Sequence, residues 1–285
     1  MHISNNNILN QLIGIYKDRT KAATLLLLFP VVLLTNCSEP KKVQVIEVQN
    51  RHQIIINDVP VYIKGANTSN NYLSILKQQG GNTIRPLQNK KRALKKAERH
   101  NLYVIYPIDY ITDHQPVLKT IQRYKNNSSV ILWDLVLHPS DIDTNDPSEW
   151  FNSLNELIVA IQSIDQNHPV MVTLPLHANK NIPYLKSNCK SLDILGIKTF
   201  DDITHLNSTL KKYQWEKPCF ISQWGPTHYS EAETTVWEAP IERTTTLKSQ
   251  WYKYRFETSV LNLQDQIIGS CVYFWGHTHV HTPTW

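Results

Sequence analysis

The stretch Gly80-Gly81-Asn82-Thr83-Ile84-Arg85 joins the end of a helical pattern to the start of a strand-like run. Two consecutive glycines favour the left-handed turn that ends an α-helix. The run that follows, Asn82–Leu87, is short and largely apolar, as a buried strand is. Short apolar runs alternate with helical patterns along the rest of the chain, so the repeating unit is one strand and one helix.

Eight such runs lie between residues 61 and 275, at Val61–Lys64, Asn82–Leu87, Leu102–Ile105, Val130–Leu137, Val170–Leu174, Ile194–Lys198, Cys219–Trp224 and Ile267–Trp275. Helical patterns separate them at 71–79, 90–100, 117–126, 149–165, 182–188, 203–213 and 244–260. This order predicts an α/β fold, a (β/α)8 TIM barrel with its functional site in the loops after the strands. A doubly wound open sheet is the alternative, but it usually has fewer strands and a glycine-rich first turn.

Two features at the ends of the barrel region add to this prediction. Val43–Gln49 and Gln53–Ile56 flank a polar turn, which predicts a short hairpin over residues 43–57 before a barrel over residues 61–285. The sequence given stops ten residues after the eighth run, so we expect the barrel to lack its last helix.

The first 36 residues have the order of a bacterial export signal. Basic residues at positions 17, 19 and 21 precede the apolar run Ala22–Leu34, which is too short to cross a hydrocarbon core of about 30 Å. Leu34-Thr35-Asn36-Cys37 resembles a lipobox. We therefore expect a signal peptide at 1–36, a lipidated tether at 37–42 beginning with Cys37, and an exported protein held at the outer membrane by this anchor alone. The alternative is an ordinary signal peptide with an incidental cysteine.

Composition and charge exclude several classes. The 285 residues are 41% hydrophobic and 19% charged, which excludes a disordered chain. Glycine-rich nucleotide motifs are absent from the sequence, so no cofactor is expected. The net charge of +5 is modest. The basic run at 90–96 is interpreted as the solvated face of a helix whose other side carries Leu94 and Ala97, and no nucleic-acid partner is expected.

Cysteine and histidine residues do not suggest a disulfide scaffold or a metal site. Three cysteines besides Cys37 are an odd number for paired disulfides, and two of them, Cys219 and Cys271, lie in apolar runs where buried thiols are expected. Histidines at 277, 279 and 281 alternate as zinc ligands could, but no carboxylate or cysteine nearby in the sequence completes a set. We interpret them as a solvated loop and expect no metal.

Six segments, taken in order, resemble the (β/α)8 catalytic domain of glycoside hydrolase family 2 and related retaining β-glycosidases. They are Ile63–Asn67, Gly80–Arg85, Val130–Trp133, Asp165–Val170, Pro218–Pro226 and Val272–Gly276. The resemblance covers nearly the whole mature chain. It implies a TIM barrel that acts on or binds oligo- or polysaccharide, and a chain shortened at its carboxyl end.

The resemblance also locates the catalytic positions. In that family a Glu after the fourth strand is the acid/base and a Glu on the seventh strand is the nucleophile; here these positions hold His138 and Gln223, and Leu137 stands where the family has Asn. Retaining hydrolysis needs two carboxylates about 5–5.5 Å apart. An imidazole exchanges protons near neutral pH, but an amide cannot attack the anomeric carbon. The resemblance therefore implies little or no turnover.

Other acidic residues offer alternatives. Asp134 is predicted to point into the barrel and to pair with Arg85. Carboxylates on loops at the barrel mouth could support an inverting reaction with a wider spacing, although the sequence selects no pair among them. They are Asp109, Asp141, Glu231 and Glu242.

The resemblance assigns a further set of side chains to the saccharide. This set is Asn67, Arg85, Phe200, Trp224, Trp237 and Trp275. Each Trp has barrel packing as its alternative role. Phe200 stands where relatives often carry Tyr, so one hydroxyl is absent.

The sequence thus predicts a lipid-anchored barrel of glycoside hydrolase ancestry that binds saccharide with little or no hydrolysis. Two alternatives stay open at this point. One is a working β-glycosidase that uses other carboxylates, and the other is a truncated, decayed product without function.

Overall fold

The computed structural model describes residues 40–142, 147–227 and 231–276. The predicted signal peptide, Cys37 and the three alternating histidines lie outside these ranges. No helix within them is long and apolar enough to cross a membrane.

A small antiparallel sheet precedes the barrel. Its strands are β1 (Val43–Val48), β2 (Arg51–Ile56) and β3 (Val59–Val61), paired in that order. The first two form the predicted hairpin. The sequence analysis did not predict the third strand. It follows β2 after a two-residue turn, Asn57-Asp58, in which both residues have positive φ, 48° and 64°. Asn and Asp tolerate this conformation, which type I′ hairpin turns require.

Eight parallel strands follow and close into a barrel, which confirms the predicted fold. In barrel order they are β4 (Ile63–Thr68), β5 (Thr83–Pro86), β6 (Tyr103–Asp109), β7 (Val130–Val136), β8 (Val170–Pro175), β9 (Ile194–Lys198), β10 (Cys219–Trp224) and β11 (Ile267–Trp275), and β10 pairs with both β9 and β11.

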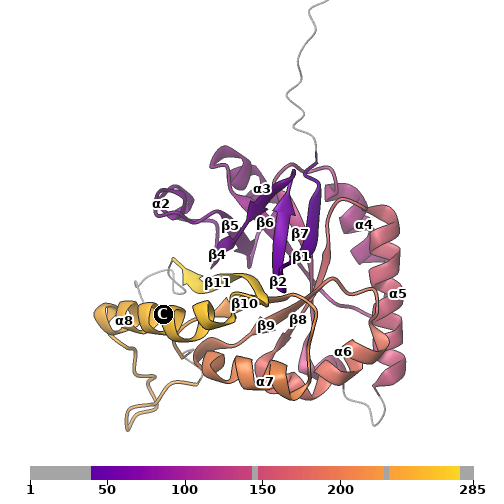
Figure 1. The fold of residues 1–285 in the computed structure, drawn as a ribbon. Helices are drawn as coiled ribbons and strands as arrows, with labels where there is room; N and C mark the ends of the chain where they lie inside the picture. Colours follow the sequence, from indigo (N-terminus) through magenta and orange to yellow (C-terminus); the bar gives the residue numbers. More distant parts are fainter. Residues whose placement is uncertain (1–39, 143–146, 228–230, 277–285) are drawn as a thin grey trace, which may run out of the picture. The chain divides into compact units, whose positions relative to one another are not determined.

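The helices between the strands match the predicted helical patterns (Figure 1). They are α2 (Leu73–Gln78), α3 (Lys90–Arg99), α4 (Gln115–Tyr124), α5 (Ser148–Ile164), α6 (Ile182–Asn188), α7 (Leu206–Lys212) and α8 (Thr245–Arg255), with further short helical turns at Pro139–Ile142, Leu176–Asn181, Phe200–His205, Phe256–Val260 and Leu261–Leu263. Gly80 ends the α2 segment with φ 86°, as the glycine pair predicted. The predicted absence of a helix after β11 falls on residues outside the described ranges.

The first barrel strand differs from the prediction. The sequence placed it at Val61–Lys64, whereas β4 begins at Ile63 and continues to Thr68. Gly65 lies inside the strand and pairs with Cys271 of the neighbouring β11, and a Cβ at position 65 would overlap the Cys271 Sγ, so the position requires glycine. This extension places Asn67 within the strand rather than in a loop.

Two apolar clusters divide the core. The outer cluster joins the strands to the helices and includes the α5 stripe of Leu154, Leu157, Ile158 and Ile161. The inner cluster fills the amino-terminal half of the barrel, where Ile54 and Ile56 of β2 pack against barrel residues such as Ile105 and Phe220. The small sheet therefore closes this end of the barrel and leaves the carboxyl end for a site.

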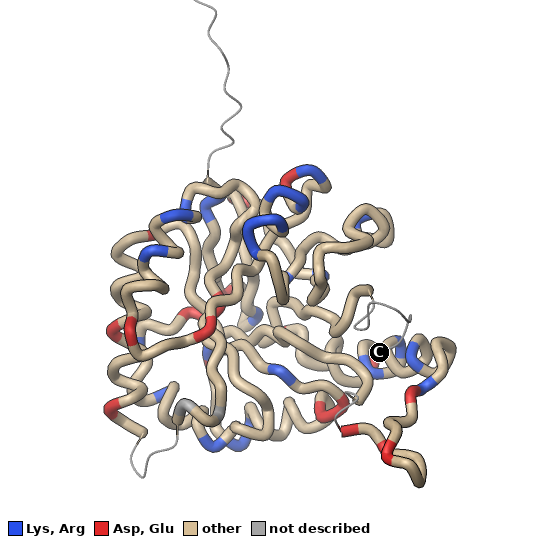
Figure 2. Tube along the Cα trace, turned by 180° about the vertical axis from the view of Figure 1, so that it is seen from behind, with Lys and Arg blue, Asp and Glu red and all other residues tan. Residues whose placement is uncertain are grey.

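Surface charge and cysteines agree with the sequence interpretation. On α3 Leu94 and Ala97 are buried while Lys91 and Lys95 are exposed, so the basic run is an outer helix face, drawn blue in Figure 2. Cys189, Cys219 and Cys271 are free and buried, and burial raises the pKa of each thiol to about 12.

A buried carboxylate, to which the sequence analysis gave no role, joins the end of α5 to β7 and to the turn before β8. Asp165 is 3% exposed and its Oδ2 accepts hydrogen bonds from Trp133 Nε1 at 2.8 Å and His168 Nδ1 at 2.7 Å. Its Oδ1 accepts a hydrogen bond from the backbone N–H of Asn167 at 2.9 Å. Burial acts to raise the pKa of Asp165, but the His168 side chain and these hydrogen bonds outweigh it, so the pKa lies below its usual value.

Asp165→Asn should lower the free energy of unfolding at pH 7 by about 2–3 kcal/mol, because charge-assisted hydrogen bonds are lost. A lowered folded pKa gives stability that is present above the unfolded value, near about 4, and is lost as pH falls through the folded value. Urea unfolding from pH 7 to pH 3 should therefore be flatter in the variant than in the unmodified protein. Asp193, whose pKa burial raises, is the control: Asp193→Asn should not flatten this acid limb.

Candidate functional site

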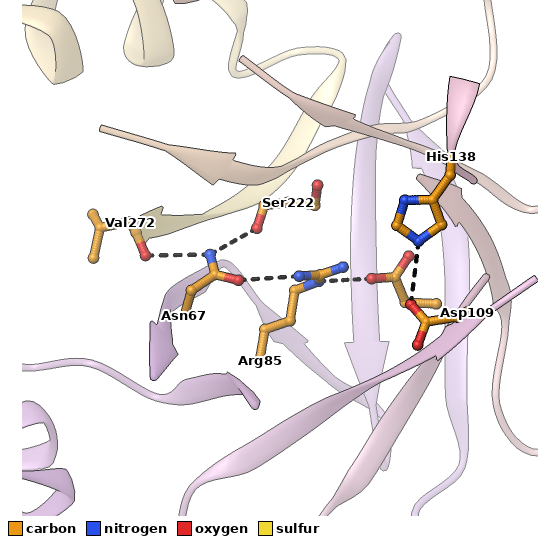
Figure 3. Close-up of polar contacts among 7 residues, drawn as sticks. Asn67, Arg85, Asp109, His138, Ser222 and Val272 are labelled. Atoms are coloured by element: carbon orange, nitrogen blue, oxygen red, sulfur yellow. Dashed lines mark hydrogen bonds and ion pairs between the residues drawn. The ribbon is translucent and has the colours of Figure 1, made fainter. Parts of the chain in front are cut away.

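The carboxyl ends of the barrel strands bring together most of the positions singled out from the sequence, as expected for this fold. Asn67 is on β4, Arg85 on β5, Asp109 at the end of β6, and His138 just after β7. Gln223 is on β10 and Trp275 ends β11. Figure 3 shows the polar contacts among part of this group.

A buried chain of hydrogen bonds lies below the mouth (Figure 3). Arg85 Nε donates to Asp134 Oδ2 at 2.7 Å, which confirms the predicted pair, and Arg85 Nη1 donates to Asn67 Oδ1 at 3.1 Å. Asn67 Nδ2 then donates to the carbonyls of Ser222 at 2.9 Å and Val272 at 3.3 Å. This chain ties β5 to β4, β7, β10 and β11.

Burial decides what these side chains do in the structure. Arg85 is 3% exposed, and Asp134 and Asn67 are fully buried. The Arg85 guanidinium is already paired with a carboxylate and an amide oxygen, so it supports the mouth from below. Direct contact of Arg85 and Asn67 with a saccharide stays a prediction.

The position predicted for an acid/base carries an imidazole next to a carboxylate. His138 Nε2 lies 3.5 Å from Asp109 Oδ1, and the two side chains are 51% and 65% exposed. Asp109 is thus the mouth-loop acid that the fold places beside His138. An imidazole beside a carboxylate is an arrangement that general acid–base chemistry can use.

Leu137, which stands where the resemblance has Asn, packs in the outer core. It is 1% exposed and belongs to the outer core cluster, and its amide donates to the Thr173 carbonyl at 2.8 Å. The side chain faces the helices because strand residues alternate between the two sides of the barrel wall. A polar side chain at this position would lie in the apolar core.

A β-bulge sets the direction of Gln223. Ile221 pairs with Ile197, but Gln223 pairs with Lys198, so β10 has one more residue than β9 over this step. Ile221 and Ile197 belong to the outer cluster. The extra residue, Ser222, therefore brings Gln223 onto the interior face beside Lys198, with 9% of its surface exposed.

Lys198 is a mouth residue that the sequence analysis missed. Its side chain has the interior parity of Ile194, which is in the inner cluster, and it is half-buried. Among the described residues it has no hydrogen bond and no carboxylate within 4 Å. Burial lowers the pKa of the Lys198 ammonium, the Arg85 charge lowers it further, and Asp134 and Asp109 act in the opposite direction. The available sequence clue was strand periodicity, because alternate residues of a strand, such as Ile194 and Lys198, lie on the same face.

The aromatic positions separate into different roles. Trp224 is 2% exposed and packs on Trp251, Tyr252 and Phe256, with ring centroids 6.0, 5.4 and 6.5 Å away. Of its two predicted roles the structure shows packing, because the residue after the bulge faces α8. Trp237, in contrast, is 74% exposed.

Two further aromatic positions lie at the mouth. Trp275 Nε1 donates to the Tyr72 carbonyl at 3.1 Å, and its ring packs against the outer cluster. The Phe200 ring stands edge-on to the Tyr273 ring at 5.1 Å. Both residues remain partly accessible, so their predicted contact with a saccharide stays a prediction.

The loop between β10 and α8 forms an excursion from the barrel, and Asp201 of the helical turn after β9 binds this excursion. Asp201 accepts hydrogen bonds from Thr227 Oγ1 at 2.8 Å, Arg243 Nη2 at 3.0 Å and Trp251 Nε1 at 2.7 Å. Trp237 lies in a turn within this excursion, where the Thr235 amide donates to the Ala239 carbonyl at 2.9 Å. The exposed indole is therefore carried by a loop that is fixed at both ends.

Two of the other mouth-loop carboxylates, Glu231 and Glu242, lie together near the start of α8. Glu231 and Glu242 line a cavity of about 510 Å³ within the excursion, and Glu242 forms an ion pair with Lys248. The side chain of Asp141 lies outside the described part of the structure. Asp109 is thus the acid of this set that the described residues place beside His138.

Comparison with known proteins identifies relatives by fold. No family model and no curated protein sequence matches the chain. Solved structures do match. A calcium-binding mutant of beta-glucuronidase 2 from Bacteroides uniformis aligns with a TM-score of 0.62 and 13% identity, over 85% of this chain and 34% of that one.

Two others give the same result. A Ruminococcus gnavus beta-glucuronidase in complex with uronic isofagomine has a TM-score of 0.60 at 14% identity, over 85% of this chain and 48% of that one. A putative beta-galactosidase from Bacteroides fragilis has a TM-score of 0.56 at 13% identity, over 82% and 38%. The chain thus has the TIM-barrel fold of these glycosidases and spans less than half the length of each.

Proposed function

We propose that this protein binds an oligo- or polysaccharide at the carboxyl-terminal mouth of its barrel, with little or no hydrolysis. The observation that carries the proposal is the pair of side chains at the two catalytic positions, the His138 imidazole and the Gln223 amide. The exposed Trp237 and the accessible Trp275 supply aromatic surface suited to a sugar ring. The shared fold with solved glycosidases supports carbohydrate as the ligand class.

The physical argument rests on position 223. A retaining mechanism requires an anionic oxygen there, both to attack the anomeric carbon and to stabilise positive charge in the transition state. A neutral amide provides neither. The ammonium of Lys198 on the neighbouring strand opposes positive charge on a ligand, so the mouth is poorly suited to an oxocarbenium-like transition state.

Trp237→Ala should weaken oligosaccharide binding about three- to tenfold, because the exposed indole is expected to stack on a sugar ring. Its stability should be unchanged because the side chain is mostly exposed. Calorimetric titration with a panel of oligosaccharides measures the change. Val236→Ala, at an even more exposed non-aromatic neighbour, is the control. The proposal is abandoned if no saccharide in the panel binds to the unmodified protein.

A second candidate, hydrolysis through other groups, is favoured by the His138–Asp109 contact. The couple could activate a water molecule, while a second acid protonates the leaving oxygen as in inverting enzymes. Turnover by the unmodified protein that Asp109→Asn abolishes would support this candidate over the first.

Export and lipid attachment at Cys37 also remain a proposal. They are supported by the order of basic residues, apolar run and lipobox-like segment alone. In this proposal the barrel contacts the membrane only through its anchor.

A further inference from the structure

The charges in the mouth do not cancel through direct pairing. The Arg85 guanidinium is neutralised by Asp134 at 2.7 Å, in a pair where both side chains are buried. The Asp109 carboxylate is 65% exposed, lies 3.5 Å from His138 Nε2, and is screened by water. Lys198 has no carboxylate within 4 Å among the described residues. Within the described part of the chain, it is therefore the mouth cation that lacks a direct counter-ion.

The neighbours of Lys198 make this arrangement unusual. On one side its strand partner is Pro175, which has no polar side chain, and on the other it is Gln223. A carboxylate at position 223 would lie on the adjacent strand, on the same interior face, and could neutralise the ammonium. The amide found there leaves the positive charge without that partner.

A half-buried ammonium without a counter-ion carries an energetic cost. Burial lowers the pKa of Lys198, which shows that the folded protein disfavours the charged form. An anionic group entering the mouth would offset this cost. Two carboxylates facing the same space act in the opposite direction, but Asp134 is committed to Arg85 and Asp109 lies largely in solvent.

We propose that the mouth takes a negatively charged saccharide and that Lys198 is the ion-pair partner of its acidic group. This inference rests on the proposed saccharide-binding function and specifies its ligand class. The acidic group is a carboxylate, as in a uronic acid, or a sulfate ester, since both present anionic oxygens to an ammonium.

The test uses oligosaccharides in matched pairs that differ only in charge. Oligogalacturonides and their methyl esters form the carboxylate arm, and sulfated and desulfated chondroitin oligosaccharides report on sulfate esters. Binding of each to the full mature domain is measured by calorimetry at pH 7. The charged member of at least one pair should bind about tenfold more tightly, in line with a hydrogen-bonded ion pair.

Three variants separate charge from fold. Lys198→Met should abolish the preference, so that the charged and neutral members of a pair bind equally well, and Lys198→Arg should retain most of the preference. Lys211→Met, on the exposed face of α7, is the matched control and should behave as the unmodified protein does. The thermal midpoint of Lys198→Met should not fall, because a buried charge without an ion pair is removed.

The outcomes separate the two proposals. Equal binding of charged and neutral members, or a preference that survives Lys198→Met, overturns this inference and leaves saccharide binding in place. Absence of binding by every oligosaccharide overturns the proposed function, and this inference with it.

Discussion

Arg85→Ala is expected to lower the free energy of unfolding by about 3–5 kcal/mol at pH 7, as is typical when one partner of a buried ion pair is removed. The substitution leaves the fully buried Asp134 carboxylate without its counter-ion. Among the described residues, Asp134 Oδ1 has no hydrogen-bond partner. It also removes the donor to Asn67, which holds β10 and β11. Urea unfolding of the mature domain measures the loss.

Two comparisons isolate the cause. The double substitution Arg85→Met with Asp134→Leu should recover most of the stability, because no buried charge remains. Arg51→Ala breaks an exposed ion pair with Asp265, whose side chains are 46% and 73% accessible, and should cost only about 0–1 kcal/mol. An effect of Arg85→Ala no larger than that of Arg51→Ala would show that the buried pair does not hold the barrel together.

Gln223→Glu should give turnover of activated aryl β-glycosides at about 10² times the background rate or more. The unmodified protein should show no turnover above background between about pH 4 and 9. The bulge on β10 already directs this side chain into the mouth. A carboxylate there supplies the missing anionic oxygen, and Lys198 on the adjacent strand favours its ionised form. Release of the chromogenic leaving group measures the rate.

Adding His138→Glu should extend activity to glycosides with poor leaving groups, because these need a proton donor. Gln223→Ala is the control, since it changes the same position without providing an oxygen nucleophile. Leu137→Asn is not a useful addition, because Leu137 is in the outer core and an amide there would be buried. Robust hydrolysis by the unmodified protein would contradict the proposal of a hydrolysis-deficient barrel and direct attention to Asp109.

Local sequence patterns were sufficient for the architecture. Alternation of short apolar runs with helical patterns predicted eight strands and the helices between them, because each strand and each helix must bury an apolar face of its own. The glycine pair at 80–81 marked the end of α2, and the interior parity of Asp134 was enough to predict its pair with Arg85. These features depend on residues close in sequence or on strand periodicity alone.

The sequence did not reveal features that depend on how neighbouring strands align. The bulge that directs Gln223 inward and Trp224 outward arises from the pairing of β10 with β9, which no local pattern encodes. The isolation of Lys198 follows from the absence of a carboxylate on any neighbouring strand. Asp165 is likewise defined by donors from β7 and from the turn before β8.

The sequence by itself thus determined the barrel and the side-chain parity along most strands, and it supplied the prediction that His138 and Gln223 stand at two catalytic positions. Only the tertiary structure decided which side chains face the mouth, which are buried beneath it and which charges are left unpaired. The physical reason is range: hydrophobic periodicity acts over a few residues, whereas ion pairing and burial depend on strands that are far apart in the chain and adjacent in the closed barrel.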